Sequence, residues 1–107
     1  MKLPELKEPW LLIEQRFIAT TADELAREVG PQHVLRGKKA RAIARRQDCD
    51  DVLFALEDGT SACAVVHLTY SRREESDPRW PSTEIFSSLE EWHAKRMLPD
   101  HEDFVSA

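Results

Sequence analysis

A β-hairpin signal in residues 50–70 constrains the fold of this chain more than any other feature. Asp58 and Gly59 separate two β-favouring runs, and such a pair is typical of a two-residue hairpin turn. That turn needs positive φ at both central residues, which Gly adopts freely and Asp tolerates. Apolar residues alternate on both sides of the turn, at Val52, Phe54 and Leu56 and at Ala64, Val66 and Leu68. We therefore expect residues 50–70 to form a hairpin.

Two helices are expected before the hairpin. Apolar residues recur at helical spacing over 10–18, after a polar, proline-containing segment at 1–9 that we interpret as a mobile lead-in. Thr21, followed three residues later by Glu24, has the pattern of a capping box, in which each side chain satisfies a free backbone N–H. The sequence therefore predicts a second helix over 22–29.

Residues 40–46 fit either a helix or a strand. Their alanines favour a helix, whereas the alternation of those alanines with Arg41, Ile43 and Arg45 favours a strand. We interpret the segment as a strand, because a hairpin packed with helices needs a third strand for stability. The alanines are then expected to face a packed helix, with the arginines on the other side of the sheet.

A closing helix is predicted after a polar loop over 71–83. Ser87 and Ser88 each have a glutamate three residues later, and Pro99 is expected to end the helix before an acidic tail over 100–107. The expected fold class is α+β in a single domain of 107 residues. It consists of N-terminal helices, a three-stranded antiparallel meander, and a C-terminal helix packed on one sheet face.

Positive charge is concentrated in one segment. The net charge of −5 disfavours general affinity for nucleic acid or an anionic membrane. Residues 36–46 nevertheless hold six basic side chains and no acid, namely Arg36, Lys38, Lys39, Arg41, Arg45 and Arg46. This segment fits RNA or anion binding, the docking of an acidic protein partner, or a solvated strand face. Because it contains no aromatic residue for base stacking, we favour the solvated face.

His67 is the residue with the clearest chemical potential. In the register of a two-residue turn Asp50 lies opposite His67, and a shift of one residue places Asp51 there. A carboxylate across the ladder orients an imidazole, as in a general base, which would suit a small hydrolase or nuclease-like enzyme. The alternative is an ordinary cross-strand polar pair. We favour that alternative, because no nucleophile or second base completes a catalytic set.

The cysteines and histidines show no metal-binding spacing. Cys49 and Cys63 are too few for a disulfide framework, and Cys63, expected opposite Phe54, is interpreted as a small core residue. The histidines do not show the i,i+4 spacing of a helical zinc motif; they are His33, His67, His93 and His101. The alternative is a site in which a histidine and acidic residues converge from distant segments. We favour its absence and expect no metal and no cofactor.

Trp80 lies within the sequence Asp-Pro-Arg-Trp-Pro of the polar loop. An exposed Trp on a loop stiffened by prolines is typical of an interface anchor, although a Trp folded onto the sheet fits equally well. The chain is small, lacks a catalytic set, and has a basic segment as well as this loop. We therefore interpret it as a non-enzymatic domain that binds a protein partner. An exposed edge strand is also compatible with a homodimer.

Four stretches resemble a family of small bacterial proteins to which no activity is assigned. In chain order, over about half of the sequence, they are Asp-Asp-Val-Leu-Phe (50–54), Ala-Val-Val-His-Leu-Thr-Tyr (64–70), Pro-Arg-Trp-Pro (78–81) and Pro-Asp-His-Glu (99–102). The resemblance implies a bacterial, cytosolic protein. The early apolar run over 10–13 is shorter than the hydrophobic region of a secretory signal, and no segment approaches membrane-spanning length. We therefore expect a cytoplasmic location.

Overall fold

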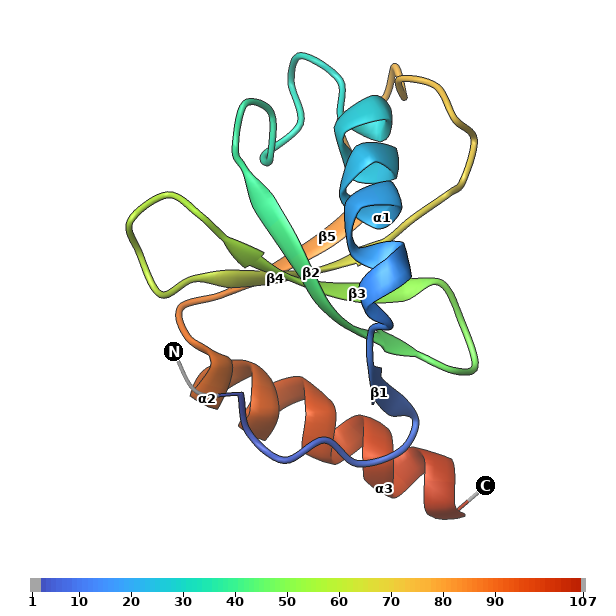
Figure 1. The fold of residues 1–107 in the computed structure, drawn as a ribbon, viewed down its shortest axis with the longest axis vertical. Helices are drawn as coiled ribbons and strands as arrows, with labels where there is room; N and C mark the ends of the chain where they lie inside the picture. The colour runs from blue at the N-terminus through green and yellow to red at the C-terminus, as the bar shows by residue number, and fades with distance from the viewer. Residues whose placement is uncertain (1–2, 107) are drawn as a thin grey trace.

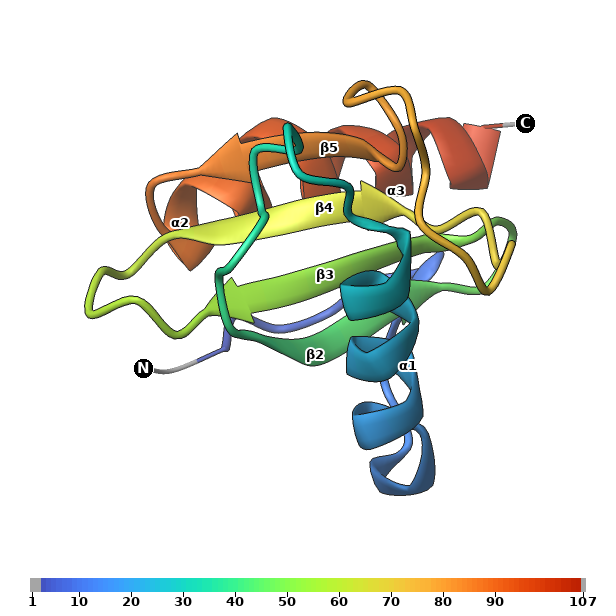
Figure 2. The same cartoon turned by 90° about the horizontal axis from the view of Figure 1, so that it is seen from above.

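The computed structural model describes residues 3–106, which form a five-stranded antiparallel sheet with helices on both faces (Figure 1). The strands follow chain order across the sheet: β1 (Trp10–Leu12), β2 (Ala40–Arg46), β3 (Asp51–Leu56), β4 (Cys63–His67) and β5 (Ser82–Phe86). Helix α1 (Gln15–Glu28) connects β1 to β2. A C-terminal helical segment follows β5 and consists of α2 (Leu89–Trp92), η1 (His93–Met97) and α3 (Leu98–Ser106). Figure 2 shows β2 to β5 side by side.

Apolar side chains form one core on each face of the sheet. Val52 and Phe54 lie in the core under α1, whereas Leu53 between them lies in the core under the C-terminal helical segment. Strand β4 divides its side chains in the same way. In the second core the rings of Trp10 and Trp92 meet edge to face, with centroids 5.3 Å apart. Because both faces are covered, β3 and β4 are continuous apolar runs rather than strands of simple alternation.

The helix predicted over 10–18 is wrong in its first part. Trp10–Leu12 forms β1 instead. Trp10 is buried in one core and Ile13, directly after β1, in the other, so these side chains lie on opposite faces of the sheet rather than on one face of a helix. Residues 22–28 are helical as expected, but they belong to the longer α1. Thr21 therefore lies inside a helix, and the capping box predicted there is wrong. Of the predicted lead-in, residues 1–2 lie outside the described residues.

The interpretation of residues 40–46 as a strand is confirmed, and its bounds are those of β2. The expected orientation of its side chains is wrong in part. The register between β2 and β3 shifts between Ala42 and Ala44, which leaves Ile43 as the extra residue of a β-bulge. Ala42 consequently lies in the core under α1, and Ala44 lies in the core under the C-terminal helical segment.

Strands β3 and β4 form the predicted hairpin in a register shifted by one residue. Asp51 lies opposite His67, so Asp50 does not take that position. Cys63 lies opposite Ala55, and the expected opposition to Phe54 is wrong. The shift changes both the partner across the ladder and the face that the β4 side chains share with β3. Val66 and Ala64 now lie opposite Val52 and Phe54, in the same core under α1.

The cause of the register shift is the loop over 57–62, which is longer than a two-residue turn. A side-chain oxygen of Asp58 accepts the backbone N–H of Thr60 at 3.0 Å, as in an Asx turn. Gly59 alone of the predicted pair takes the left-handed conformation, with a φ of 86°. A turn built on the Asp58 side chain therefore replaces the predicted turn built on two left-handed residues.

The predicted three-stranded meander is wrong because two further strands flank it. β1 pairs with β2 at one edge, and β5, which begins inside the predicted loop over 71–83, pairs with β4 at the other. Both additions are antiparallel. The expectation that helices cover one face is wrong for the same reason, since α1 and the C-terminal helical segment lie on opposite faces (Figure 1).

The closing helix begins as predicted and extends further. The Ser88 hydroxyl accepts the N–H of Glu91 at 3.1 Å, which confirms the cap. Pro99 does not end the helix, so residues 100–106 of the predicted acidic tail are helical. A π-helical turn over His93–Met97 directly precedes Pro99. Its altered hydrogen-bond pattern accommodates a residue that has no backbone N–H to donate.

Two buried carboxyl groups on α1 hold the loop between β4 and β5. Glu28 accepts the backbone N–H groups of Thr69 and Tyr70, at 2.8 and 2.9 Å. Glu24 accepts the N–H of Arg72 at 3.1 Å. The two carboxyl groups are hydrogen-bonded to each other; burial and this bond raise the pKa of Glu28, while the same bond lowers the pKa of Glu24. The contact therefore favours the protonated form of Glu28 and the ionised form of Glu24.

The raised pKa of Glu28 predicts a pH dependence of folding. A carboxyl group whose pKa is higher in the folded state stabilises the fold below its unfolded pKa, and that contribution is lost as pH rises through the folded pKa. We expect Glu28→Gln, which does not titrate, to flatten the corresponding fall in stability. Urea denaturation of both proteins between about pH 4 and about pH 8 measures the effect. Parallel pH profiles for the two proteins would contradict the assignment.

Candidate functional site

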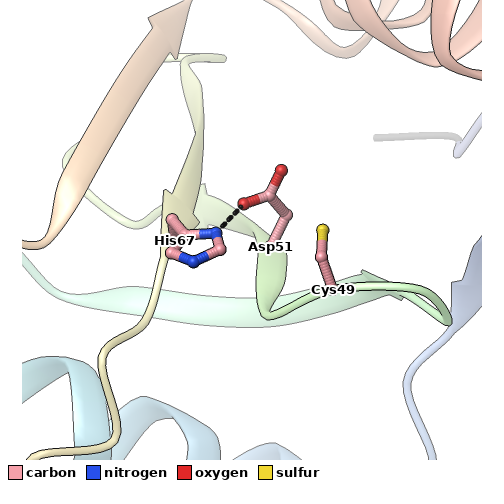
Figure 3. Close-up of side chains that lie close together, drawn as sticks. All are labelled: Cys49, Asp51 and His67. Carbon is pink, nitrogen blue, oxygen red and sulfur yellow. Dashed lines mark hydrogen bonds and ion pairs between the residues drawn. The ribbon is translucent and has the colours of Figure 1, made fainter.

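The predicted site around His67 lies at the end of the sheet where β3 begins and β4 ends (Figure 3). Nδ1 of His67 is 2.7 Å from Oδ1 of Asp51, so Asp51 and not Asp50 is the carboxylate that orients it. The His67 side chain is 49% exposed, whereas that of Asp51 is 11% exposed. The imidazole is therefore held in one orientation and still open to solvent.

Arg96, from the C-terminal helical segment, fixes Asp51 from the other side. Its guanidinium pairs with Oδ2 of Asp51 and, at 2.9 Å, with Asp100. Glu84 on β5 lies 3.3 Å from the same guanidinium, and Arg46 lies 3.3 Å from Asp100. Burial alone would lower the pKa of Arg96, but the charges of Asp100 and Asp51 raise it above the ordinary value. The arginine therefore stays charged and locks the carboxylate in place.

A hollow of about 570 Å³ opens beside this ion-pair network. Its lining includes Asp51, His67, Trp80, Ser82, Glu84 and Arg96. Trp80 is 46% exposed, so it neither folds into the core nor extends fully into solvent. The concave site expected for chemistry at His67 is therefore present, and Trp80 belongs to it.

Cys49 is a further chemical group at this site. Its Sγ, a carboxylate oxygen of Asp51 and a ring nitrogen of His67 all lie within 4.8 Å of one another (Figure 3). Sequence reasoning missed this set because neither the histidines nor the cysteines show a metal-binding spacing, and these three residues come together from a turn and two paired strands. Partial burial of the Cys49 thiol raises its pKa, and Asp51 lies between that thiol and the imidazole. The arrangement does not suit an activated cysteine nucleophile.

The six basic side chains of residues 36–46 do not form one free strip. Three of them are paired with acids of this chain: Arg36 with Glu74 at 3.2 Å, Lys38 with Asp58 at 3.6 Å, and Arg46 with Asp48 at 2.8 Å. Lys39, Arg41 and Arg45 have no such ion pair within the part of the chain that the structure describes. The partial neutralisation favours the solvated-face interpretation over a continuous anion-binding strip.

Two other candidates for chemistry have structural roles. Nδ1 of His33 accepts the N–H of Leu35 at 3.0 Å, so Nε2 carries the proton and donates it to the carbonyl of Pro81 at 2.9 Å. His33 thus joins the segment after α1 to the start of β5. Cys63 is a core residue, and burial raises the pKa of its thiol to about 11, which keeps it unreactive.

The four stretches that carry the resemblance to small bacterial proteins meet at this site. Each contributes at least one residue to the hollow or to its ion pairs; in chain order these include Asp51, His67, Trp80 and Asp100. Comparisons with family models, curated proteins and solved structures find no match for this chain. The resemblance therefore stays a prediction. No helix within residues 3–106 has the length and apolar character needed to cross a membrane.

Proposed function

We propose that the protein is a binding domain that recognises a protein partner at the edge of the sheet beside the hollow. The observation that carries this proposal is Trp80, whose half-exposed ring lines the hollow. Such a Trp is typical of an interface hot spot, because it buries a large apolar area when a partner covers it. β5 is also an edge strand, and no strand within residues 3–106 pairs with its outer side.

The charge around the hollow indicates the chemistry of the partner. The network contains two guanidinium groups and four carboxylates, the latter being Asp48, Asp51, Glu84 and Asp100. The carboxylates therefore exceed the guanidinium groups by two. A cationic side chain of a partner could lie over the Trp80 ring and pair with Glu84, which is 57% exposed. We infer an extended basic segment that adds to β5 as a further strand.

Peptide selection tests the proposal. Random peptides displayed on phage are selected against the full chain, and the enriched sequences are measured against Glu84→Lys. We expect enriched peptides that alternate β-favouring residues and carry Lys or Arg, with weaker binding to Glu84→Lys. Glu57→Lys, an exposed charge reversal after the far end of β3, is the matched control and should leave binding unchanged. Enrichment of acidic peptides, or of none, would overturn the proposal.

A hydrolase or nuclease-like activity at His67 is the second candidate. It is favoured by one observation, the accessible imidazole that Asp51 orients at the hollow. Hydrolysis of a nitrophenyl ester and of a nitrophenyl phosphodiester by the full chain tests it. Loss of a general base should slow His67→Gln by about a hundredfold. Equal rates for His67→Gln and the unaltered chain would remove this candidate.

Binding of RNA or another anion through residues 36–46 is the third candidate. It draws on Lys39, Arg41 and Arg45, the basic side chains of that segment without an acidic partner among the described residues. Affinity for an RNA strand should then fall steeply with salt. Binding that is insensitive to salt, or no binding, would count against it.

A further inference from the structure

We propose that Cys49, Asp51 and His67 form a binding site for a zinc-type divalent cation. Their donor atoms already converge within 4.8 Å of one another (Figure 3). A thiolate, a carboxylate and an imidazole are ligands that Zn²⁺ accepts together, and three protein ligands leave a fourth position for water. Mg²⁺ and Ca²⁺ prefer oxygen ligands alone, so this set selects against them.

The sheet and its ion pairs hold two of the three ligands in place. Asp51 is directly opposite His67 in the β3–β4 register. Arg96 takes Oδ2 of Asp51, which leaves Oδ1 directed at the imidazole and available to a metal. An outer hydrogen bond of this kind orients a ligating carboxylate and strengthens metal binding.

Two adjustments remain. Oδ1 of Asp51 and Nδ1 of His67, now 2.7 Å apart, would exchange their hydrogen bond for bonds to the metal and separate slightly, and the Cys49 thiol would move closer. Tetrahedral bonds of about 2.0–2.3 Å place donor atoms about 3.5 Å apart. Cys49 lies in the turn between β2 and β3 and is exposed, so its thiol can approach without moving either strand. It would bind as the thiolate and release its proton to solvent, while His67 would bind as the neutral imidazole. The exposed side of His67 leaves access for a water molecule as fourth ligand.

Titration of the reduced full chain with Zn²⁺, and with Co²⁺ as a spectroscopic probe, tests this site. We expect one metal per chain and a thiolate-to-cobalt charge-transfer band. Cys49→Ser should abolish the band and weaken Zn²⁺ binding about tenfold or more, and His67→Gln should weaken it similarly. His93→Gln, in the C-terminal helical segment, is the matched control and should bind like the unaltered chain.

Alkylation of the unaltered chain provides a readout that needs no variant. Cys63 is buried and Cys49 is exposed, so the folded chain should react at Cys49. We expect Zn²⁺, but not Mg²⁺, to slow this reaction. The proposal would be overturned by binding of less than one Zn²⁺ per chain or by equal Zn²⁺ affinity in Cys49→Ser. Alkylation of Cys49 at the same rate with and without Zn²⁺ would also overturn it. Cys49 does not line the hollow, so peptide selection with Cys49→Ser separates failure of the metal site from failure of the proposed function.

Discussion

Replacing Trp80 by alanine is expected to lower the affinity for a selected basic peptide about thirtyfold or more. Truncation of an interface hot spot costs about 2 kcal/mol or more, and 1.4 kcal/mol corresponds to a factor of ten. Because the Trp80 side chain is half exposed, its removal leaves no buried cavity, and we expect little change in Tm. Titration calorimetry of the peptide with both proteins measures the loss.

Phe17→Ala is the matched control for Trp80→Ala. Phe17 is an aromatic residue of similar exposure, 42%, but it lies on α1 and does not line the hollow. Its removal should leave peptide affinity unchanged. Equal losses in the two variants would show that the peptide binds exposed aromatic rings without preference. Unchanged binding by Trp80→Ala would remove Trp80 from the proposed interface.

Arg96→Met is expected to lower the free energy of unfolding by about 3 kcal/mol, the lower end of the cost of removing one member of a buried ion pair. The Arg96 side chain is 22% exposed, and the Asp51 and Asp100 carboxylates that it contacts are 11% and 14% exposed. Methionine preserves much of the side-chain volume but leaves Asp51 without its cationic partner. Urea denaturation measures the difference between the two proteins.

Lys95→Met is the control for this substitution. Lys95 lies next to Arg96 in the same helical turn, but its ion pair with Glu91 is on the surface, with 68% of the lysine side chain exposed. An exposed pair of this spacing contributes about 0.3–0.5 kcal/mol. A loss in Arg96→Met no larger than that in Lys95→Met would contradict the buried network around Asp51.

The hairpin was predictable because its signals are local, whereas β2 was predicted as a strand only because the hairpin needs a third strand. Alternation along β3 and the Asp58-Gly59 pair required nothing from the rest of the chain. The register was not predictable to one residue, because it depends on the Asp58 side chain bonding to Thr60 rather than on backbone turn type. This one-residue difference in register decides whether Asp50 or Asp51 lies opposite His67. The two edge strands were missed because β1 has three residues and β5 is mostly polar and exposed.

The site was predictable only where it rests on the hairpin. A carboxylate beside His67 follows from any register near the predicted one. Arg96 could not be foreseen, since it is 45 residues from Asp51 in sequence and depends on how the C-terminal helical segment crosses the sheet. Its pairing with Asp100 was hidden by the expectation that Pro99 ends the helix. The position of Trp80 at the hollow likewise depends on the unpredicted β5.

The most direct test of the binding proposal is an amide NMR titration of the isotope-labelled full chain with the selected basic peptide. We expect chemical-shift changes to concentrate on β5, His67 and the indole N–H of Trp80, which together border the hollow. Changes centred on residues 36–46, with β5 and the Trp80 indole unaffected, would contradict it.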